Sequence, residues 1–183
     1  TKGEESIGNI DDYLATLGLV LKVYIDDLTQ VARISQMTQK TNQFNLTTKR
    51  YTKREITALI KEEGSTVISI NVQDKYGDNG LIGLAILDNT QSMIGTLLLS
   101  CRALGRNIEY QFMDVIVGIA KRNKLIELSA AYIKTNKNQQ VVDFYEKCGF
   151  IKLNESDGDS QYSLQVNSYK NQNIQYIGLR DGR

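Results

Sequence analysis

A short segment of the sequence places glycine and arginine where an apolar run gives way to a helical pattern. The segment 102–107 reads R-A-L-G-R-N and contains Arg102, Gly105 and Arg106. In such a connection, successive backbone N–H groups and the dipole of the following helix can bind a pyrophosphate. Gly105 allows the backbone to approach the anion closely, and either arginine adds positive charge. A strand-to-helix connection with one glycine is also common where nothing binds, so this segment needs a second feature beside it.

That second feature is the segment 138–150, which reads N-Q-Q-V-V-D-F-Y-E-K-C-G-F. Asn138 begins a predicted helix, Tyr145 lies near its end, and Gly149 is suited to the left-handed conformation that ends many helices. Two interpretations of Asn138 are open: its side chain orients the amides of a bound ligand, or it caps the helix. Tyr145 likewise either takes part in the chemistry or buries its ring beside Phe144.

Apolar periodicity predicts the elements that position these segments. Continuous apolar and β-branched runs are typical of strands, apolar residues at helical spacing mark helices, and Asn107 is the expected N-cap of the helix after the loop. The predicted helices lie at 10–17, 28–40, 53–62, from 108 onward and around 141–145. The predicted strands lie at 19–25, 66–74, 80–87, 94–100, 125–133, 150–153 and 162–166, and the polar stretch 41–52 is expected to be a loop.

The composition limits the partners of the chain. Its 183 residues are enough for one main domain with a substantial core. With 22 basic and 21 acidic residues the net charge is +1, so we expect no extended basic surface and no nucleic acid partner. No apolar stretch is long enough to cross a bilayer, so we expect no membrane partner.

The residues missing from the sequence limit the chemistry. Histidine is absent, which removes the commonest general base and most catalytic zinc sites, and we expect no metal. Cys101 and Cys148 are too few for a disulfide framework, which favours a reducing cytoplasm. Glu109 and Asp114 lie on the helix after the loop, but carboxylates near the start of a helix usually just interact favourably with its dipole. The sequence therefore names no general base.

Together, the segments 102–107 and 138–150 resemble two motifs of the GNAT acyltransferase superfamily, in their order and separation. The pyrophosphate loop of that superfamily reads R/Q-x-x-G-x-G/A, and its later segment reads N-x-x-A-x-x-x-Y-x-x-x-G-F. The predicted element order agrees from residue 19 to residue 166. The resemblance implies an α/β (α+β) fold with a central mixed, mostly antiparallel twisted sheet flanked by helices. Asn107 departs from the pattern, because it stands where the superfamily has Gly or Ala.

The resemblance also implies an activity and a site. It implies acyl transfer from acetyl-CoA or another acyl-CoA to a small acceptor, an amine or a hydroxyl compound, in a cleft between the strands at 94–100 and 125–133. A backbone amide of the first strand would polarise the thioester carbonyl, and Tyr145 would protonate the leaving thiolate. The residues implied in binding the donor are Leu98, Leu99, Ser100, Arg102, Gly105, Arg106, Asn107 and Asn138.

Three further segments give a narrower resemblance, to the C-terminal part of FkbH-like proteins. They are T-N-Q-F-N-L-T-T-K-R-Y-T at 41–52, Y-G-D-N-G at 76–80 and L-L-S-C-R-A-L-G-R at 98–106. In that family a phosphatase-type domain of the haloacid dehalogenase (HAD) class comes first, and members are associated with loading a glyceryl unit onto a carrier protein's phosphopantetheine. The resemblance implies an upstream HAD-type domain and, as an alternative donor, an acyl-phosphopantetheine on an acyl carrier protein.

Two expectations follow for function and organisation. The alternative to an acyltransferase is a non-catalytic GNAT-like module that docks a phosphopantetheinylated carrier protein for a HAD-type domain. For the chain itself we expect a helical extension at 1–18, a GNAT-like acyltransferase domain at 19–167 and a loosely held C-terminal tail at 168–183. The abrupt polar start suggests a fragment of a longer protein.

Overall fold

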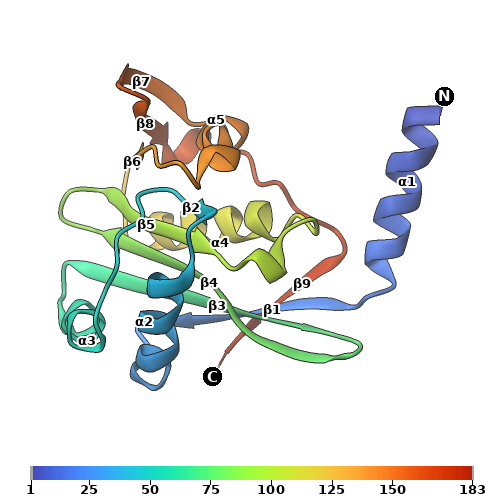
Figure 1. The fold of residues 1–183 in the computed structure, drawn as a ribbon, viewed down its shortest axis with the longest axis horizontal. Coiled ribbons are helices and arrows are strands. Elements are labelled where there is room, and N and C mark those ends of the chain that lie inside the picture. Colours follow the sequence, from blue (N-terminus) through green and yellow to red (C-terminus); the bar gives the residue numbers. More distant parts are fainter. Residues whose placement is uncertain (1, 183) are drawn as a thin grey trace.

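A single twisted sheet forms the centre of the computed structural model, which describes residues 2–182 and the side chains from residue 9 onward (Figure 1). Its nine strands follow the order β7-β8-β6-β5-β4-β3-β1-β9, with β2 paired to β5 beside this path. In this part of the chain, β5 with β6 and β1 with β9 are parallel neighbours and the other pairs are antiparallel. The expected mixed, mostly antiparallel sheet is confirmed. The strands are β1 (Leu19–Ile25), β2 (Phe44–Asn45), β3 (Ser65–Asp74), β4 (Gly77–Asp88), β5 (Met93–Leu99), β6 (Glu127–Tyr132), β7 (Ile151–Ser156), β8 (Asp159–Gln165) and β9 (Ile177–Asp181).

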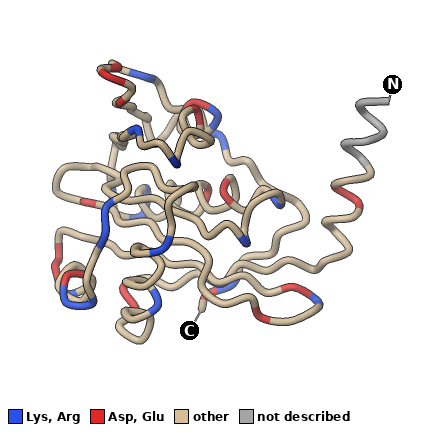
Figure 2. Tube along the Cα trace, in the orientation of Figure 1, with Lys and Arg blue, Asp and Glu red and all other residues tan. Residues whose placement is uncertain are grey.

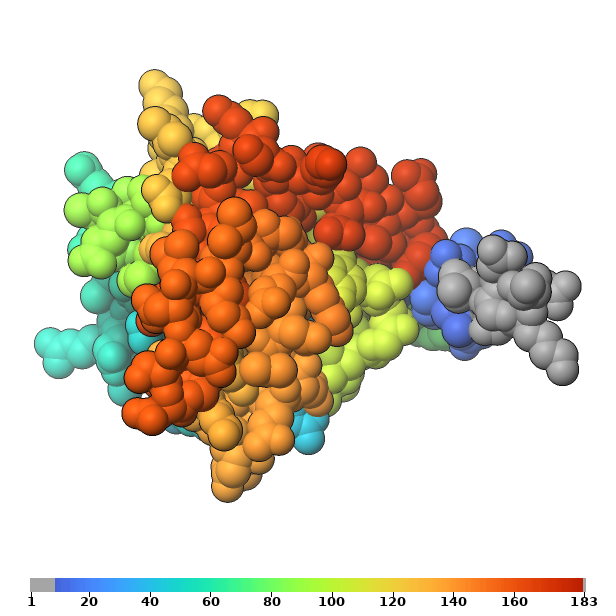
Figure 3. Space-filling model, turned by 90° about the horizontal axis from the view of Figure 1, so that it is seen from above, coloured from blue at the N-terminus to red at the C-terminus, as the bar shows by residue number. Residues whose placement is uncertain are grey.

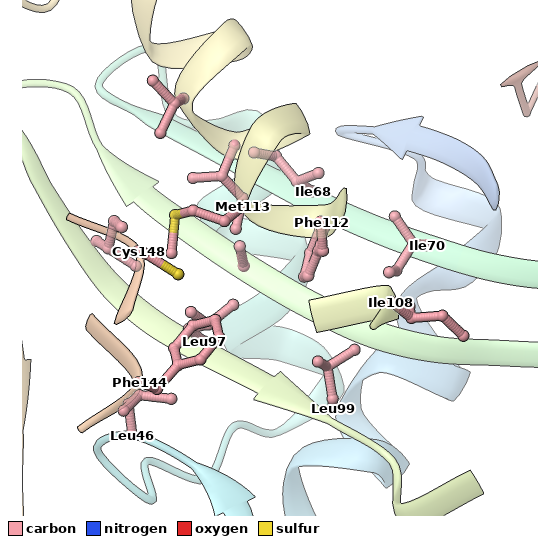
Figure 4. Packing of buried hydrophobic residues seen from close by; sticks show 14 of the residues in the cluster. Leu46, Ile68, Ile70, Leu97, Leu99, Ile108, Phe112, Met113, Phe144 and Cys148 are labelled. Atoms are coloured by element: carbon pink, nitrogen blue, oxygen red, sulfur yellow. The ribbon is translucent and has the colours of Figure 1, made fainter. Parts of the chain in front are cut away.

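Helices cover both faces of this sheet. The helices are α1 (Lys2–Ala15), α2 (Val31–Lys40), α3 (Lys53–Lys61), α4 (Ile108–Arg122) and α5 (Phe144–Lys147). Helices α2 and α3 bury Ile34 and Ile56 in a core on one face, whereas α4 buries Phe112 in the larger core on the other (Figure 4). Successive strand residues point to opposite faces, so Val67 joins the first core and Ile68 the second. The sheet is therefore buried on both sides.

Most predicted elements are confirmed. The helix predicted at 28–40 begins with a 3₁₀ turn at Leu28–Gln30, the predicted loop at 41–52 contains β2, and two other helices differ further. The first helix is longer than the predicted 10–17, since α1 begins at Lys2. The helix predicted around 141–145 is divided into a 3₁₀ turn at Gln139–Val141 and the four-residue α5. Neither piece has a side-chain cap, and the Asn138 side chain, for which capping was one of two interpretations, bonds elsewhere. Uncapped short helices are marginal, which explains the division.

The C-terminal residues form part of the sheet, which corrects the expectation of a loosely held tail. Strand β9 pairs in parallel with β1 along five residues. Before reaching β1, the chain is held by Asp114 of α4, whose carboxylate accepts hydrogen bonds from the Tyr169 hydroxyl at 2.5 Å and the backbone N–H groups of Gln172 and Asn173 at 2.8 and 2.9 Å. Gln111 of the same helix also accepts, from the Ile174 N–H at 3.0 Å, so two side chains of α4 hold this segment.

Helix α1 projects from the body of the molecule (Figures 1 and 3). Ile10 and Tyr13 on it are exposed, and only near its end does Leu14 enter the core. Basic and acidic residues are interspersed along the rest of the chain (Figure 2), in keeping with the net charge of +1. Among the described residues, no helix is long and apolar enough to span a bilayer.

Candidate functional site

The connection from β5 to α4 is an open loop with unused backbone donors. It starts with a 3₁₀ turn, in which the Ala103 N–H donates to Ser100 O at 2.9 Å. It then opens at Gly105, which has a φ of 84° that glycine adopts at little cost. Within residues 2–182, the backbone N–H groups of Gly105, Arg106 and Asn107 donate to no protein acceptor. The three groups stand just before the N-terminus of a fifteen-residue helix, an arrangement that suits an anion.

The two arginines of this loop have different roles. Arg106 folds back, and its guanidinium donates to Arg102 O at 2.6 Å and lies 3.8 Å from the Asp74 carboxylate. It therefore stabilises the loop. The Arg102 side chain is exposed and forms no hydrogen bond or ion pair with another described residue. Arg102 is consequently the arginine whose charge is available to a bound phosphate.

Asn107 stands where the resembled pattern has a small residue, and the structure gives its local role. Its φ is 60°, a left-handed conformation that asparagine tolerates better than most residues with a side chain. Its side chain does not cap α4. Instead it donates to the Tyr176 hydroxyl at 2.7 Å, and that hydroxyl donates to Arg106 O at 3.2 Å. The amide of Asn107 thus connects the loop to the C-terminal segment.

Strands β5 and β6 part beyond Ile94, and we call this region the seam. The two strands pair only at Met93 with Ser129 and Ile94 with Ala130. The expected cleft between them is filled by residues 44–46, which we call the plug segment. Phe44 and Asn45 of β2 pair with the end of β5.

Leu46 bridges the two sides of the seam. Its N–H donates to Leu97 O on β5 at 3.1 Å, and the Ile133 N–H, just after β6, donates to Leu46 O at 2.8 Å. Leu46 is fully buried, and Figure 4 shows it near Leu97 and Phe144. The plug segment therefore acts as a short strand inserted between β5 and the end of β6.

The backbone of Leu98, Leu99 and Ser100 has neighbours on both sides. Leu98 and Leu99 pair with β4 on one side and with the plug segment on the other. The Ser100 N–H donates to Ile82 O at 2.8 Å. The backbone of these three residues was expected to provide an amide for a thioester carbonyl, and in this conformation the Ser100 amide is used within the sheet.

Asn138 holds the plug segment in the seam. Its amide nitrogen donates to Asn45 O and Ile133 O, each at 2.9 Å. Its amide oxygen accepts from the Thr135 N–H at 2.8 Å and from the Tyr132 hydroxyl at 3.1 Å. The side chain is fully buried and all four of its contacts are within the chain, so in this conformation it neither caps a helix nor faces a ligand.

A cavity of about 230 Å³ lies beside the loop, between α4 and the α5 region. One end is formed by the loop at Gly105, and Phe44 of the plug segment forms another part of the wall. Phe44 packs edge-to-face against Phe144, with ring centroids 5.0 Å apart. The lining residues are Phe44, Leu104, Gly105, Glu109, Tyr110, Gln140, Val141, Asp143, Phe144 and Lys147.

Glu109 and Tyr110 are polar groups on the cavity wall. The sequence interpretation gave Glu109 only a favourable interaction with the helix dipole, and it missed Tyr110. Burial raises the pKa of Glu109, and its Oε2 atom is buried with no hydrogen-bond partner among the described residues. Burial also raises the pKa of Tyr110, and Lys147 opposes both shifts. The sequence offered one signal for these two residues, which is their position in the first helical turn after the loop. Side chains of that turn lie beside any anion that the loop binds.

Tyr145 lies in the aromatic core and does not line the cavity. Its ring centroid is 5.0 Å from that of Phe150 and 5.5 Å from that of Tyr162, and 1% of the residue is exposed. Complete burial raises the pKa of its hydroxyl. The surroundings of Tyr145 fit the interpretation in which its ring is buried beside Phe144.

In the described chain, no three His, Cys, Asp or Glu side chains come together as metal ligands.

Comparisons with known proteins place the fold. The chain matches no family model and no curated relative. Mutant forms of the spermidine/spermine N-acetyltransferase of Vibrio cholerae align with a TM-score of 0.59 and 13% identity, over 81% of this chain and 95% of that one. The ribosomal-protein-S18-alanine N-acetyltransferase of Escherichia coli aligns with a TM-score of 0.60 and 10% identity, over 84% and 97% of the two chains.

A third similar structure contains a ligand. A putative acetyltransferase from Salmonella typhimurium, solved with its cofactor acetyl-CoA, aligns with a TM-score of 0.56 and 12% identity, over 82% of this chain and 96% of that one. The sheet order, the helices on both faces and these alignments agree. The chain therefore has the GNAT fold that these N-acetyltransferases share.

Proposed function

We propose that this chain transfers an acyl group from an acyl-CoA to an amine. The observation that carries the proposal is the loop at 105–107, where three unused backbone N–H groups stand beside a cavity at the start of α4. These donors and the exposed Arg102 would bind the pyrophosphate of the donor. Fold similarity to N-acetyltransferases, and to a putative acetyltransferase solved with acetyl-CoA, supports the same class of donor.

The cavity would accept part of the pantetheine arm. That arm carries amide N–H groups, and the unpartnered carboxylate oxygen of Glu109 is an acceptor for one of them. The Tyr110 hydroxyl forms no hydrogen bond with a described residue and is a second partner for the arm. In the transfer step the neutral amine nitrogen bonds to the thioester carbon, the carbon–sulfur bond breaks, and the nitrogen releases a proton to solvent. The leaving thiolate takes a proton, for which Tyr145 remains the donor proposed from the GNAT resemblance, and solvent reprotonates the tyrosine. For this role the hydroxyl must reach the thiolate from the aromatic core in which the ring is buried.

Two tyrosine variants separate binding from chemistry. Tyr110→Phe should raise the Kd for CoA roughly threefold to tenfold with little change in kcat, because it removes a contact to the arm. Tyr145→Phe should lower kcat by roughly a hundredfold and leave the Kd unchanged, because it removes only a proton donor. Steady-state kinetics with acetyl-CoA and a polyamine or peptide amine measures kcat, and calorimetric titration with CoA measures the Kd. An unchanged kcat in Tyr145→Phe ends the assignment of that tyrosine.

The filled seam favours a second candidate function. Because the plug segment occupies the cleft expected for the thioester, the chain would instead be a non-catalytic module that docks a phosphopantetheinylated carrier protein for a HAD-type domain. In that case the donor is an acyl-phosphopantetheine, as the FkbH-like resemblance implies. Both cysteines are free, so a reducing cytoplasm is the proposed location for either function.

Calorimetric titration distinguishes the two functions. The purified chain is titrated with acetyl-CoA, CoA and a phosphopantetheinylated carrier protein. Binding of the free CoA species supports the transferase, and an amine screen for turnover then follows. Binding of the carrier alone supports the docking module, whereas binding of none of the three contradicts both.

A further inference from the structure

The plug segment uses the backbone groups that a linear ligand would need in the seam. Strand β5 presents an edge beyond Ile94 after β6 turns away, and an open strand edge is a place where an extended chain can add by backbone hydrogen bonds. Leu46 takes this place, with its N–H on Leu97 O and its carbonyl on the Ile133 N–H. An extended arm with amide groups would compete for these same two partners.

The side chains of the plug segment fill the space as well. Leu46 and Asn45 are fully buried, and Phe44 is 5% exposed. Phe44 both pairs with β5 and lines the cavity beside the loop at 102–107. A ligand that entered this cavity and continued toward the seam would therefore meet the Phe44 ring first.

The contacts that hold the plug segment are side-chain contacts and a short strand pair. Asn138 donates to Asn45 O, and the Thr47 hydroxyl donates to Gly95 O at 3.3 Å. Strand β2 itself contributes two residues to the sheet. By contrast, β4 pairs with β5 over six residue pairs. The pairing of β2 with β5 is thus as short as that of β5 with β6, and these are the two shortest strand pairings among the described residues.

We infer that the plug segment is an autoinhibitory contact, which an acyl donor's pantetheine arm must displace from the seam before the arm can pair with β5. This inference rests on the proposed acyltransferase function. The plugged state is the ground state, so the apparent affinity for the donor is the intrinsic affinity reduced by the fraction of open molecules. Weakening the plug therefore tightens donor binding.

Hydrogen exchange tests the displacement in the unaltered protein. The N–H groups of Leu46 and Ile133 are both bonded across the seam, so they exchange slowly in the free chain. At saturating CoA, the Leu46 N–H should exchange at least about tenfold faster, because the arm takes its acceptor, Leu97 O. The Ile133 N–H should stay protected, because the arm replaces Leu46 O as its acceptor. CoA binding with unchanged or increased protection at Leu46 overturns the inference and leaves the proposed transferase standing.

A pair of leucine variants tests the effect on affinity. Leu46→Ala removes a fully buried side chain from the plug segment, and Leu84→Ala removes one from the core on the opposite face of the sheet. We expect the Kd for CoA to fall about tenfold in Leu46→Ala and to stay constant in Leu84→Ala. Equal Kd values in both variants overturn the inference. CoA binding to neither the unaltered chain nor Leu46→Ala overturns the proposed function and the plug together.

Discussion

The loop at 102–107 and the seam are two halves of one candidate donor site. They differ in how many of their hydrogen-bonding groups are already bonded within the chain. In the loop, the N–H groups of residues 105–107 have no acceptor in the described chain, and Arg102 is exposed. In the seam, the backbone of Leu46 is bonded on both sides, and Asn138 makes four contacts within the chain.

Under the proposed function, the difference teaches that the groups for the pyrophosphate and the place for the thioester arm are prepared to different extents in this structure. The loop needs only a left-handed turn and a helix N-terminus, which the local sequence provides. The seam is a tertiary feature, because a segment from residues 44–46 enters it from elsewhere in the chain. The loop is therefore ready for an anion, whereas the seam must change before it accepts an arm.

The largest expected effect tests how strongly the seam is held. Asn138→Ala leaves Asn45 O and Ile133 O without their donor, and buried unsatisfied groups are costly. We expect the free energy of unfolding to fall by about 3 kcal/mol, measured by urea denaturation. Asn89→Ala loses a partly buried bond to Thr66 and an exposed bond from Asn123. It is the control and should cost less than about 1 kcal/mol. Equal losses of unfolding free energy in Asn138→Ala and Asn89→Ala would contradict a special contribution of Asn138 to the stability of the seam.

A smaller effect tests the loop. Arg102→Ala should raise the Kd for CoA about tenfold and reduce its dependence on salt, because an exposed charge near the phosphates is lost. Arg122→Ala, at the other end of α4, is the matched control and should leave the Kd unchanged. Titrations at two salt concentrations measure both variants. If Arg122→Ala weakens CoA binding as much as Arg102→Ala does, the anion site is not at the loop.

The third prediction concerns the cavity wall between the two halves. The folded-state pKa of Glu109 is raised by burial, so its contribution to stability is fully present below its unfolded value of 4.5 and is lost as pH rises through the folded value. Glu109→Gln should therefore be more stable than the unaltered protein at pH 7, by about 1 kcal/mol, and equally stable near pH 4.

Urea denaturation at the two pH values measures this difference. The exposed Glu63→Gln serves as control, since its side chain lies outside the cavity. A stability gain for Glu109→Gln that is the same at both pH values contradicts the burial argument. Glu109→Gln also removes a negative charge beside the loop. This loss should not weaken the binding of CoA, because the phosphates of CoA are themselves negative.

The smallest effect tests the connection between the loop and the C-terminal segment. Tyr176→Phe removes the hydroxyl that accepts from Asn107 and donates to Arg106 O. We expect a stability loss of about 0.5–1 kcal/mol in thermal or urea unfolding. Tyr13→Phe, on the exposed part of α1, should change nothing. A larger loss in Tyr13→Phe than in Tyr176→Phe would contradict the contact.

The sequence predicts the elements better than the contacts between them. The strand at 19–25 is found with those bounds, and the loop at 102–107 leads into a helix as expected, because local patterns and a glycine determine both. The stretch 41–52 has weak periodicity and was expected to be a loop. That it contains β2 depends on partners in β5 and on Asn138, which no local pattern encodes.

The candidate site shows the same limit. The anion loop and its arginines could be predicted, but sequence does not say that Arg106 folds back onto Asp74 whereas Arg102 stays exposed. Tyr145 was singled out by its spacing from Asn138, yet its ring lies among Phe150 and Tyr162. Which tyrosine faces a cavity depends on how α4 and α5 pack, so Tyr110 could be found only in three dimensions.

The pairing of β1 with β9 has a consequence for folding during synthesis. Strand β1 is among the first parts of the domain to leave the ribosome, and β9 is the last strand of the sheet. Until β9 arrives, the outer edge of β1 has unpaired backbone groups, and such edges favour aggregation. Joining the first and last strands also requires a contact of large sequence separation, which slows folding. Nascent chains that stop before residue 177 should therefore depend most on chaperones.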